Sequence, residues 1–308
     1  MPVSTNGASP APGAGGSGAN APGAAGVELV FNCFERTIGL VTSTPVLTDL
    51  AKALAYPFAR RTLLVNNVAD PGRWSADLDR LVAEGAVDRW LSVADELPAA
   101  LATTGLRPRD IRHRRHWTDF GLVTVALPGP PYVCYCDPEI EFTVPGDWIG
   151  PAIELMQRDR SVAVANPRWA HGPPPEERAD ERVGEFLVGY GFTDQIFLLD
   201  RREFAAPIYR SRVPVSLRSP ASLRYPGAAD SFVFEMRVDA YMRTRRRRRA
   251  THTTVTYAHA RPDGSSYRPA GLGAGLGRLR NLVVLKLLVE LHRRSPRLRL
   301  HGLLGERS

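Results

Sequence analysis

The sequence lacks the features of several protein classes. It has only three cysteines in 308 residues, Cys33, Cys134 and Cys136, and they do not have the paired spacing of a zinc site. All three lie in apolar runs, so we expect reduced core thiols in a cytoplasmic protein. The most apolar late segment, residues 281–291, is too short to cross a bilayer and is interrupted by charged residues. We therefore expect no membrane-spanning helix.

The first residues also lack the pattern of a secretory signal. Residues 1–26 are almost all Gly, Ala, Pro, Ser and Asn, with neither a basic start nor an apolar core. We expect a disordered leader there, followed by one globular domain over residues 27–260 and a basic tail over residues 261–308. No internal repeat is visible.

The positive charge is unevenly distributed. The formal net charge is +8, but the tail has ten basic residues against three acidic ones, and the arginine run RTRRRRR (residues 243–249) adds six arginines. The rest of the chain is slightly acidic, and no aromatic residue interrupts the run. Nucleic acid is therefore not expected as a partner. The run could instead contact an anionic membrane or a diphosphate, or end a helix as a solvated segment favoured by the helix dipole.

The tail places apolar and basic residues at near-helical spacing, with Leu279, Leu282 and Val283 followed by Lys286. A basic amphipathic helix of this kind is typical of a segment lying on an anionic membrane surface. Packing against the globular domain, with the basic residues in water, is the alternative, and the sequence leaves both open.

Strand-like and helix-like segments alternate through the globular region. Apolar runs beginning at Val27 and Arg61 are typical of strands, and a helix is expected to begin at Pro45 with Thr44 as its cap. Later, residues 251–260 alternate like an edge strand. The alternation predicts an α/β fold with βαβ units and a mainly parallel sheet flanked by helices.

Ligands bind at the carboxyl ends of strands in such sheets. Three predicted strand ends carry acids or amides: Glu35 after the first strand, Asn67 and Asp70 after the second, and Asp137 with Glu139 after a later one.

The last of these ends is the stretch PYVCYCDPEIEF, residues 131–142. It brings Asp137, Glu139 and Glu141 out of an apolar run, and burying carboxylates without cations is costly. Asp137 and Glu139 offer hard oxygen ligands, which suit Mg²⁺ or Mn²⁺. The alternative is a surface Asp-Pro turn with its acids in solvent.

The order of these features resembles the GT-A-type nucleotide-sugar glycosyltransferases, particularly the large family-2-like group with its D-x-D motif. The resemblance covers about residues 27–260 and rests on the two acidic strand ends, the Asp137-Pro138-Glu139 triplet, an acid-bearing helix and a late histidine. It implies a GT-A-like (nucleotide-diphospho-sugar transferase) fold, with mixed strands in the half that binds the acceptor.

The resemblance also implies a divalent-metal site. Asp137 and Glu139 match the D-x-D pair, and His259 lies where a late histidine completes the metal site. The second acid of the motif is Glu rather than the usual Asp, so this motif is only DXD-like and its ligand arm is longer.

Donor-binding roles carry over to the strand ends. Glu35 and Arg36 match the loop that touches the nucleotide, and Asp70, with Asn67 beside it, matches the acid that contacts the base or ribose. Asp137 would reach the sugar-nucleotide as well as the metal.

The resemblance further implies that Glu235 is the catalytic base. The signature is not a clean Glu-Asp pair, because FVFEM offers Glu235 alone, with Asp230 five residues earlier as the second candidate.

Acceptor contacts are suggested by the segment GYGFTDQ. Its glycines permit close backbone approach, and Asp194 and Gln195 can hydrogen-bond to hydroxyls. Trp169 can stack on a sugar. A twisted strand pair with a solvated turn, and a tryptophan used only for packing, are the alternatives.

Together these features predict a metal-dependent, hexosyltransferase-like glycosyltransferase. It would move a sugar from a nucleoside-diphosphate sugar to a hydroxyl of a sugar, lipid-linked or small-molecule acceptor, with attachment to a membrane surface left open. Two alternatives remain: a non-catalytic basic protein binding nucleic acid or membrane on a degenerate version of this fold, and a nucleotidyltransferase.

Overall fold

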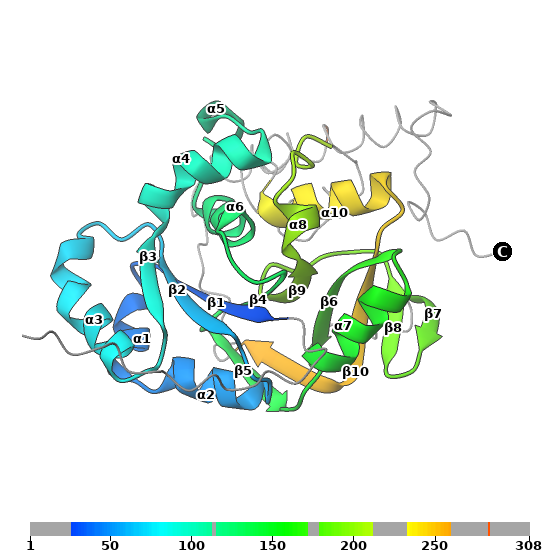
Figure 1. Cartoon of the computed structure of the whole chain (residues 1–308), viewed down its shortest axis with the longest axis horizontal. Coiled ribbons are helices and arrows are strands. Elements are labelled where there is room, and N and C mark those ends of the chain that lie inside the picture. The colour runs from blue at the N-terminus through cyan, green and yellow to red at the C-terminus, as the bar shows by residue number, and fades with distance from the viewer. Residues whose placement is uncertain (1–25, 113–114, 172–178, 212–232, 260–282, 284–308) are drawn as a thin grey trace, which may run out of the picture.

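A computed structural model of the chain describes residues 26–112, 115–171, 179–211, 233–259 and 283 (Figure 1). The predictions for the leader, for the tail apart from Val283, and for Asp230 lie outside these residues. None of the described helices is long and apolar enough to cross a membrane.

The first half of the described chain is built from βαβ units. Its strands lie side by side and parallel in the order β3-β2-β1-β4. They are β1 (Val27–Cys33), β2 (Arg60–Val65), β3 (Arg89–Ser92) and β4 (Tyr132–Cys136). The helical segments between them are α1 (Ile38–Ser43), α2 (Val46–Ala53), η1 (Pro71–Trp74), α3 (Ser75–Ala83), α4 (Val93–Thr104), α5 (Pro108–Ile111), η2 (Arg115–Trp117) and α6 (Asp119–Ala126).

The second half continues the same sheet with strands of both directions. Its elements are β5 (Ile140–Val144), α7 (Ile149–Arg158), β6 (Val162–Trp169), β7 (Ala179–Val183), β8 (Phe186–Gly189), β9 (Ile196–Asp200), α8 (Arg201–Phe204), α10 (Phe234–Thr244) and β10 (Arg248–His259). Strand order continues β4-β9-β6-β10-β8-β7, and β5 pairs with β10. The predicted fold class, an α/β sheet flanked by helices with mixed strands in the second half, is confirmed.

Two apolar cores hold the helices against the sheet. In β1, Leu29 and Phe31 pack into the core shared with α1, α2, α3 and α7, whereas Val30 packs into the core shared with α4, α6, α8 and α10. Figure 1 shows this second group of helices on one side of the strands. A strand buried on both faces must be apolar at successive positions, which is why the first strand is a nearly continuous hydrophobic run.

One buried carboxylate ties three strands and helix α8 together at the opposite end of the sheet from Asp137. Glu28 on β1 is fully buried and accepts hydrogen bonds from Arg60 at 2.8 and 2.9 Å and from the Thr62 hydroxyl at 2.6 Å, and it also pairs with Arg89 and Arg201. Burial raises the pKa of Glu28, but the hydrogen bonds from Arg60 and Thr62 and the charge of Arg201 more than offset this, so the pKa lies below its ordinary value.

Several local predictions are corrected by the structure. Residues 251–259 belong to β10, an interior strand flanked by β6 on one side and by β8 and β5 on the other, so the prediction of an edge strand was wrong. Thr44 does not cap the next helix, because its hydroxyl donates to the Leu40 carbonyl at 2.8 Å and ends α1. Strand β5 was not anticipated. The three cysteines are free and buried, as predicted.

Candidate functional site

The candidate site begins where β4 ends. The backbone N–H of Asp137 donates to the carbonyl of Gln195 at 2.8 Å, continuing the antiparallel pairing in which Cys136 lies opposite Ile196. This pairing brings the polar segment before β9, which contains Asp194, alongside the acid that ends β4. The predicted metal ligand Asp137 and the predicted acceptor residues Asp194 and Gln195 are therefore neighbours.

A tight turn after Asp137 directs the chain toward β10. The Asp137 Oδ1 accepts the Glu139 backbone N–H at 2.9 Å, and the Ile140 N–H donates to the Asp137 carbonyl at 3.2 Å. Strand β5 then pairs antiparallel with β10, with Ile140 opposite His259. Burial lowers the pKa of His259, and the nearby Glu139 carboxylate opposes that shift. Glu139 thus lies near Asp137 on one side and near His259 on the other.

The donor types in this group fit a hard divalent cation. Carboxylates and an imidazole are ligands that Mn²⁺ and Mg²⁺ sites use. Among the described residues, however, no three His, Cys, Asp or Glu side chains converge closely enough to hold a metal ion. The rotamers of Glu139 and His259 would therefore have to adjust around a bound ion.

Glu235 reaches the same region from helix α10. It occupies the first turn of the helix, next to Phe234, which packs directly over Gly121 of α6. A Cβ at Gly121 would lie only 2.3 Å from the Phe234 ring, so glycine is needed for α10 to approach this closely. Burial, together with the negative charges of Asp194 and Asp239, raises the pKa of Glu235 well above its ordinary value.

The carboxylates of this site act on one another. Burial and the charges of Glu139 and Asp194 raise the pKa of Asp137 to about 7, against an opposing hydrogen bond from the Glu139 backbone. Burial raises the pKa of Asp194 to about 6. Carboxylates held close together with perturbed pKa values are typical of functional sites, because a fold rarely gains stability from them.

The predicted donor-binding residues lie in the two loops after β1 and β2. The Glu35 carboxylate accepts the Ala69 backbone N–H at 2.9 Å, which joins these loops. Asn67 has a left-handed φ of 49°, and Asp70 caps η1 by accepting the Arg73 N–H at 3.3 Å. Glu35, Arg36, Asn67 and Asp70 are all exposed. Part of the role of Glu35 and Asp70 is therefore to shape the loops.

A buried acid beneath these loops was not predicted. Asp119, at the first position of α6, is 1% exposed and accepts hydrogen bonds from Asn66 Nδ2 at 3.0 Å and from the Phe120 N–H at 2.8 Å. Burial raises the pKa of Asp119. The available signal was an acid opening an otherwise apolar helical run, but an acid there is equally typical of an ordinary helix N-terminus.

Trp169 lies at the end of β6, where it is in register with Tyr257 of β10. It is 42% exposed, which is high for so large an apolar side chain. Asp230, the second candidate for the base, lies outside the described residues.

Three arginines of the run form ion pairs with acids, and two of them do so with acids distant along the chain. The ion pairs join Arg243 to Asp239, Arg247 to Glu203, and Arg248 to Asp159 and Glu181. The run crosses from the end of α10 into β10. Arg245 and Arg246 are exposed at the helix end, as the interpretation of a solvated helix end expects, whereas Arg247 and Arg248 are not explained by it. These pairs also count against the non-catalytic nucleic-acid-binding alternative, because Arg243, Arg247 and Arg248 already have anionic partners.

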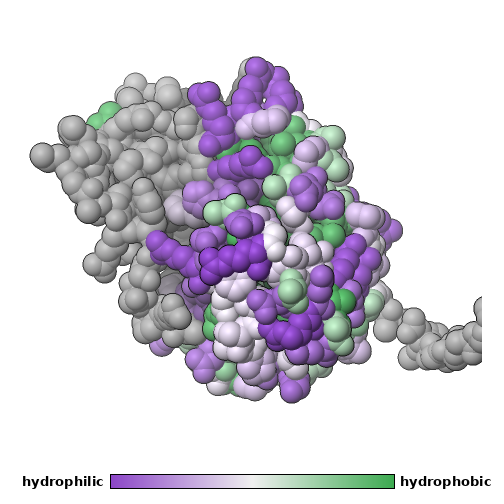
Figure 2. Space-filling view, turned by 90° about the vertical axis from the view of Figure 1, so that its left-hand side faces the viewer, coloured by the Kyte–Doolittle hydropathy of each residue, from purple (hydrophilic) through white to green (hydrophobic). Residues whose placement is uncertain are grey.

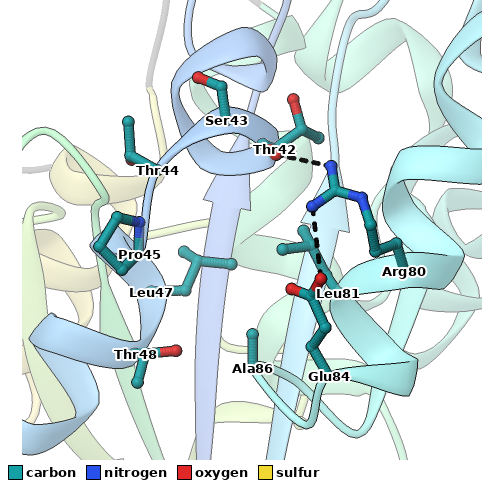
Figure 3. A pocket seen from close by; sticks show the side chains of 10 residues that line it. All are labelled: Thr42, Ser43, Thr44, Pro45, Leu47, Thr48, Arg80, Leu81, Glu84 and Ala86. Atoms are coloured by element: carbon teal, nitrogen blue, oxygen red, sulfur yellow. Dashed lines mark hydrogen bonds and ion pairs between the residues drawn. The ribbon is translucent and has the colours of Figure 1, made fainter.

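A separate cavity of about 280 Å³ lies among α1, α2 and α3 (Figure 3). Its lining includes Thr42, Ser43 and Thr44, whose hydroxyls donate to carbonyls one turn earlier in α1, and Arg80, which donates to the Thr42 carbonyl at 2.9 Å. None of the acids of the candidate site lines it. Figure 2, viewed from the left-hand side of Figure 1, shows small hydrophobic patches scattered among hydrophilic side chains.

No protein-family model and no curated protein matches the chain. Solved structures are similar to it. GalNAc-T7 with UDP, GalNAc and Mn²⁺ has a TM-score of 0.47 and 12% identity, over 87% of this chain and 50% of that one. A galactosyltransferase, LgtC, with donor and acceptor sugar analogues has a TM-score of 0.37 and 14% identity, over 86% and 99%.

A third similar structure is glucosyl-3-phosphoglycerate synthase from Mycobacterium tuberculosis with Mn²⁺, UDP and glucosyl-3-phosphoglycerate, with a TM-score of 0.39 and 14% identity, over 84% of this chain and 78% of that one. This chain thus spans about half the length of GalNAc-T7.

Proposed function

We propose that this protein is a divalent-metal-dependent glycosyltransferase that uses a nucleoside-diphosphate sugar. The observation that carries the proposal is the group of four acids and one histidine at the carboxyl edge of the sheet: Asp137, Glu139, Asp194, Glu235 and His259. They come from four separate stretches of the chain, and the mutual repulsion of the acids would have to be offset by a cation or by protons.

Asp137, Glu139 and His259 would hold the metal. A divalent ion there would stabilise the negative charge that grows on the diphosphate as the glycosidic bond breaks. The protein's own contribution is to aim these ligands. The Asp137 carboxylate is fixed by the Glu139 N–H at 2.9 Å, and His259 is brought beside Glu139 by the pairing of β5 with β10.

The loops after β1 and β2 would bind the nucleotide. Glu35 links the two loops through the Ala69 N–H, and Asn67 and Asp70 lie on the second loop with exposed polar side chains. Carboxylates and amides there can accept hydrogen bonds from a ribose or a base, and Arg36 can meet a phosphate.

Glu235 would accept the proton of the acceptor hydroxyl. A general base works best when its pKa is near the operating pH, and the raised pKa of Glu235 moves it in that direction. Asp194, Gln195 and Trp169 would contact the acceptor, and Asp230 is the alternative base. Attachment of the tail to an anionic membrane and a cytoplasmic location stay predictions from the sequence.

The proposal is tested by incubating the full chain with a panel of UDP-, GDP- and TDP-sugars, in Mn²⁺, in Mg²⁺ and in EDTA. We expect metal-dependent release of a nucleoside diphosphate from one donor, by slow hydrolysis without an acceptor and faster with one. A nucleotidyltransferase would instead exchange radioactive pyrophosphate into a nucleoside triphosphate. Absence of nucleoside diphosphate release from every donor would contradict the proposal.

A further inference from the structure

Strand β10 has a bulge partway along its pairing with β6. His252 lies opposite Pro167 of β6, and Thr256 lies opposite the next residue of β6, Arg168. Residues 253–255 are therefore inserted between two positions that pair with consecutive residues of the neighbouring strand. Because the insertion is odd in number, it changes which side chains face the first core: Ala250 before the bulge and Tyr257 after it both pack there.

The bulge determines which residue of β10 reaches the candidate metal site. After it, β10 pairs with β5, and His259 lies opposite Ile140, just beyond the turn of Asp137 and Glu139. In an unbroken strand every later residue would be displaced by the three inserted positions, and Thr256 would lie opposite Ile140 instead. An imidazole is present at this place only because the bulge is there.

A buried histidine closes the bulge. His252 is 2% exposed, and its Nδ1 accepts the backbone N–H of Val255 at 3.0 Å. The imidazole packs edge-on against Phe186 of β8, with ring centroids 5.1 Å apart. From the segment before β8, the Glu185 carbonyl accepts the Thr253 N–H at 2.9 Å and the Thr253 hydroxyl at 3.0 Å. One side-chain acceptor and one backbone acceptor thus hold the inserted residues.

These contacts define the protonation state of the ring. A nitrogen that accepts a hydrogen bond carries no proton, so Nδ1 is bare and the neutral ring carries its proton on Nε2. Nε2 lies 3.7 Å from the Glu185 carboxylate, which is too far for a hydrogen bond. Burial lowers the pKa of His252, and the charges of Glu185 and of Asp147, in the segment before α7, oppose that shift. A second proton on Nδ1 would set two N–H donors against each other.

We propose that His252, as a neutral imidazole with its proton on Nε2, is a positioning residue that closes the β10 bulge and thereby places His259 opposite Ile140 beside the metal site. The meaning of this placement for a metal rests on the proposed function, whereas the bulge and its hydrogen bonds do not. Protonation of His252 removes the acceptor for Val255, so acid would act on the site through a residue that touches neither the metal nor the substrate.

The first test is NMR of the ligand-free full chain labelled with ¹⁵N-histidine. The His252 ring is assigned by its NOE contacts with the Phe186 ring, so no variant is needed. We expect Nδ1 without a proton and Nε2 with one at pH 7, and a backbone NOE between His259 and Ile140. A proton on Nδ1 at pH 7, on either a neutral or a charged ring, would overturn the proposal.

The second test compares urea unfolding at pH 7 and pH 5. His252→Asn keeps an acceptor oxygen near the place of Nδ1 but does not titrate. On acidification the unfolding equilibrium constant of wild type should rise about tenfold relative to that of His252→Asn, because histidine binds a proton near pH 6.5 in the unfolded chain and resists it in the fold. His171→Asn, at an exposed histidine after β6, should follow wild type. A constant or falling ratio would mean that the folded state accepts the charged ring, which contradicts the proposal.

The third test separates positioning from stability. His252→Phe keeps an aromatic ring but removes the acceptor, and it should lose the NOE between His259 and Ile140 that His252→Asn retains. Mn²⁺-dependent binding of UDP or GDP at pH 7 should weaken about tenfold or more in His252→Phe and stay within about twofold of wild type in His252→Asn. An NOE and a binding constant unchanged in His252→Phe would refute the positioning role.

Two further results keep the outcomes distinct. Should His252→Phe not fold, acidification of wild type replaces it: the NOE between His259 and Ile140 should weaken from pH 7 to pH 5 in wild type and persist in His252→Asn, and its persistence in both would refute the role. A wild type that binds no nucleotide with Mn²⁺ would count against the proposed function alone. The NMR and unfolding results need no ligand and would still decide whether His252 sets the register of His259.

Discussion

The backbone N–H of Asp137 donates to the carbonyl oxygen of Gln195 at 2.8 Å, across the antiparallel pair formed by β4 and β9. This bond places Asp137, at the end of β4 in the parallel half, beside the polar segment that precedes β9. Strand β9 is the neighbour of β4 in the sheet and belongs to the mixed half. In the proposed enzyme, the metal and diphosphate would lie on one side of this junction and the acceptor hydroxyl on the other.

Replacing Glu235 with Gln should slow sugar transfer by about 10²- to 10⁴-fold, because the amide keeps the shape of the side chain but cannot accept the proton. Nucleotide binding should change little, since Glu235 lies on α10 rather than in the donor loops. Glu154→Gln, at an exposed position of α7, is the matched control and should have wild-type turnover. Near-normal turnover of Glu235→Gln would assign the base to Asp230 or remove the need for one.

The ligand-free protein should lose stability as the pH rises through the range in which its site carboxylates ionise. The folded state raises the pKa of Asp137 to about 7 and of Asp194 to about 6, so it holds protons that the unfolded chain releases near pH 4. Because the folded state holds more protons, these groups stabilise the fold at low pH. As the pH rises, their contribution to the free energy of unfolding decreases by up to about 1.4 kcal/mol per pH unit for each proton.

The corresponding variant is Asp194→Asn, which should be more stable than wild type by about 1–2 kcal/mol at pH 8 and nearly equal to it at pH 4. Asp49→Asn, at an exposed position of α2, should follow the wild-type curve. Urea unfolding at both pH values measures the difference. A variant that is less stable than wild type at pH 8 would mean that Asp194 is a structural acid.

Glu28→Gln should destabilise the fold by about 3–5 kcal/mol, because it leaves the buried guanidinium of Arg201 without its carboxylate. Glu84→Gln provides the comparison. Glu84 pairs with Arg80 at 3.6 Å at the surface, so its loss should cost no more than about 1 kcal/mol. Equal effects of the two substitutions in urea unfolding would show that burial does not set the strength of the Glu28 network.

The local pattern of the sequence was enough to predict the parallel half of the sheet. Apolar runs separated by helical segments located β1, β2 and β4, and the acids that follow them lie at one sheet edge because parallel strands end together. Asp137 and Glu139 were found in this way, and the apolar spacing of α10 indicated the helix that carries Glu235.

The neighbours of β10 and the partners of the arginine run depend on contacts between segments that are distant along the chain. Alternation in residues 251–259 indicates a strand but not its neighbours, and it does not show that β6, β8 and β5 all pair with β10. The arginine run gave no sign of its partners, because Asp159, Glu181 and Glu203 are each about 40 or more residues away along the chain.

In the proposed function, Asp137 binds a divalent metal together with a nucleoside diphosphate. The most direct measurement is the thermal stability of wild type and Asp137→Asn with UDP or GDP, each with and without Mn²⁺, compared with the same protein free of ligand. Wild type should be stabilised by nucleotide only when Mn²⁺ is present, by about 2.7 kcal/mol at a ligand concentration of 100 Kd, and Asp137→Asn should lose that response. An Asp137→Asn protein that keeps the full Mn²⁺-dependent stabilisation, or a wild type that shows none with any nucleoside diphosphate, would contradict the claim.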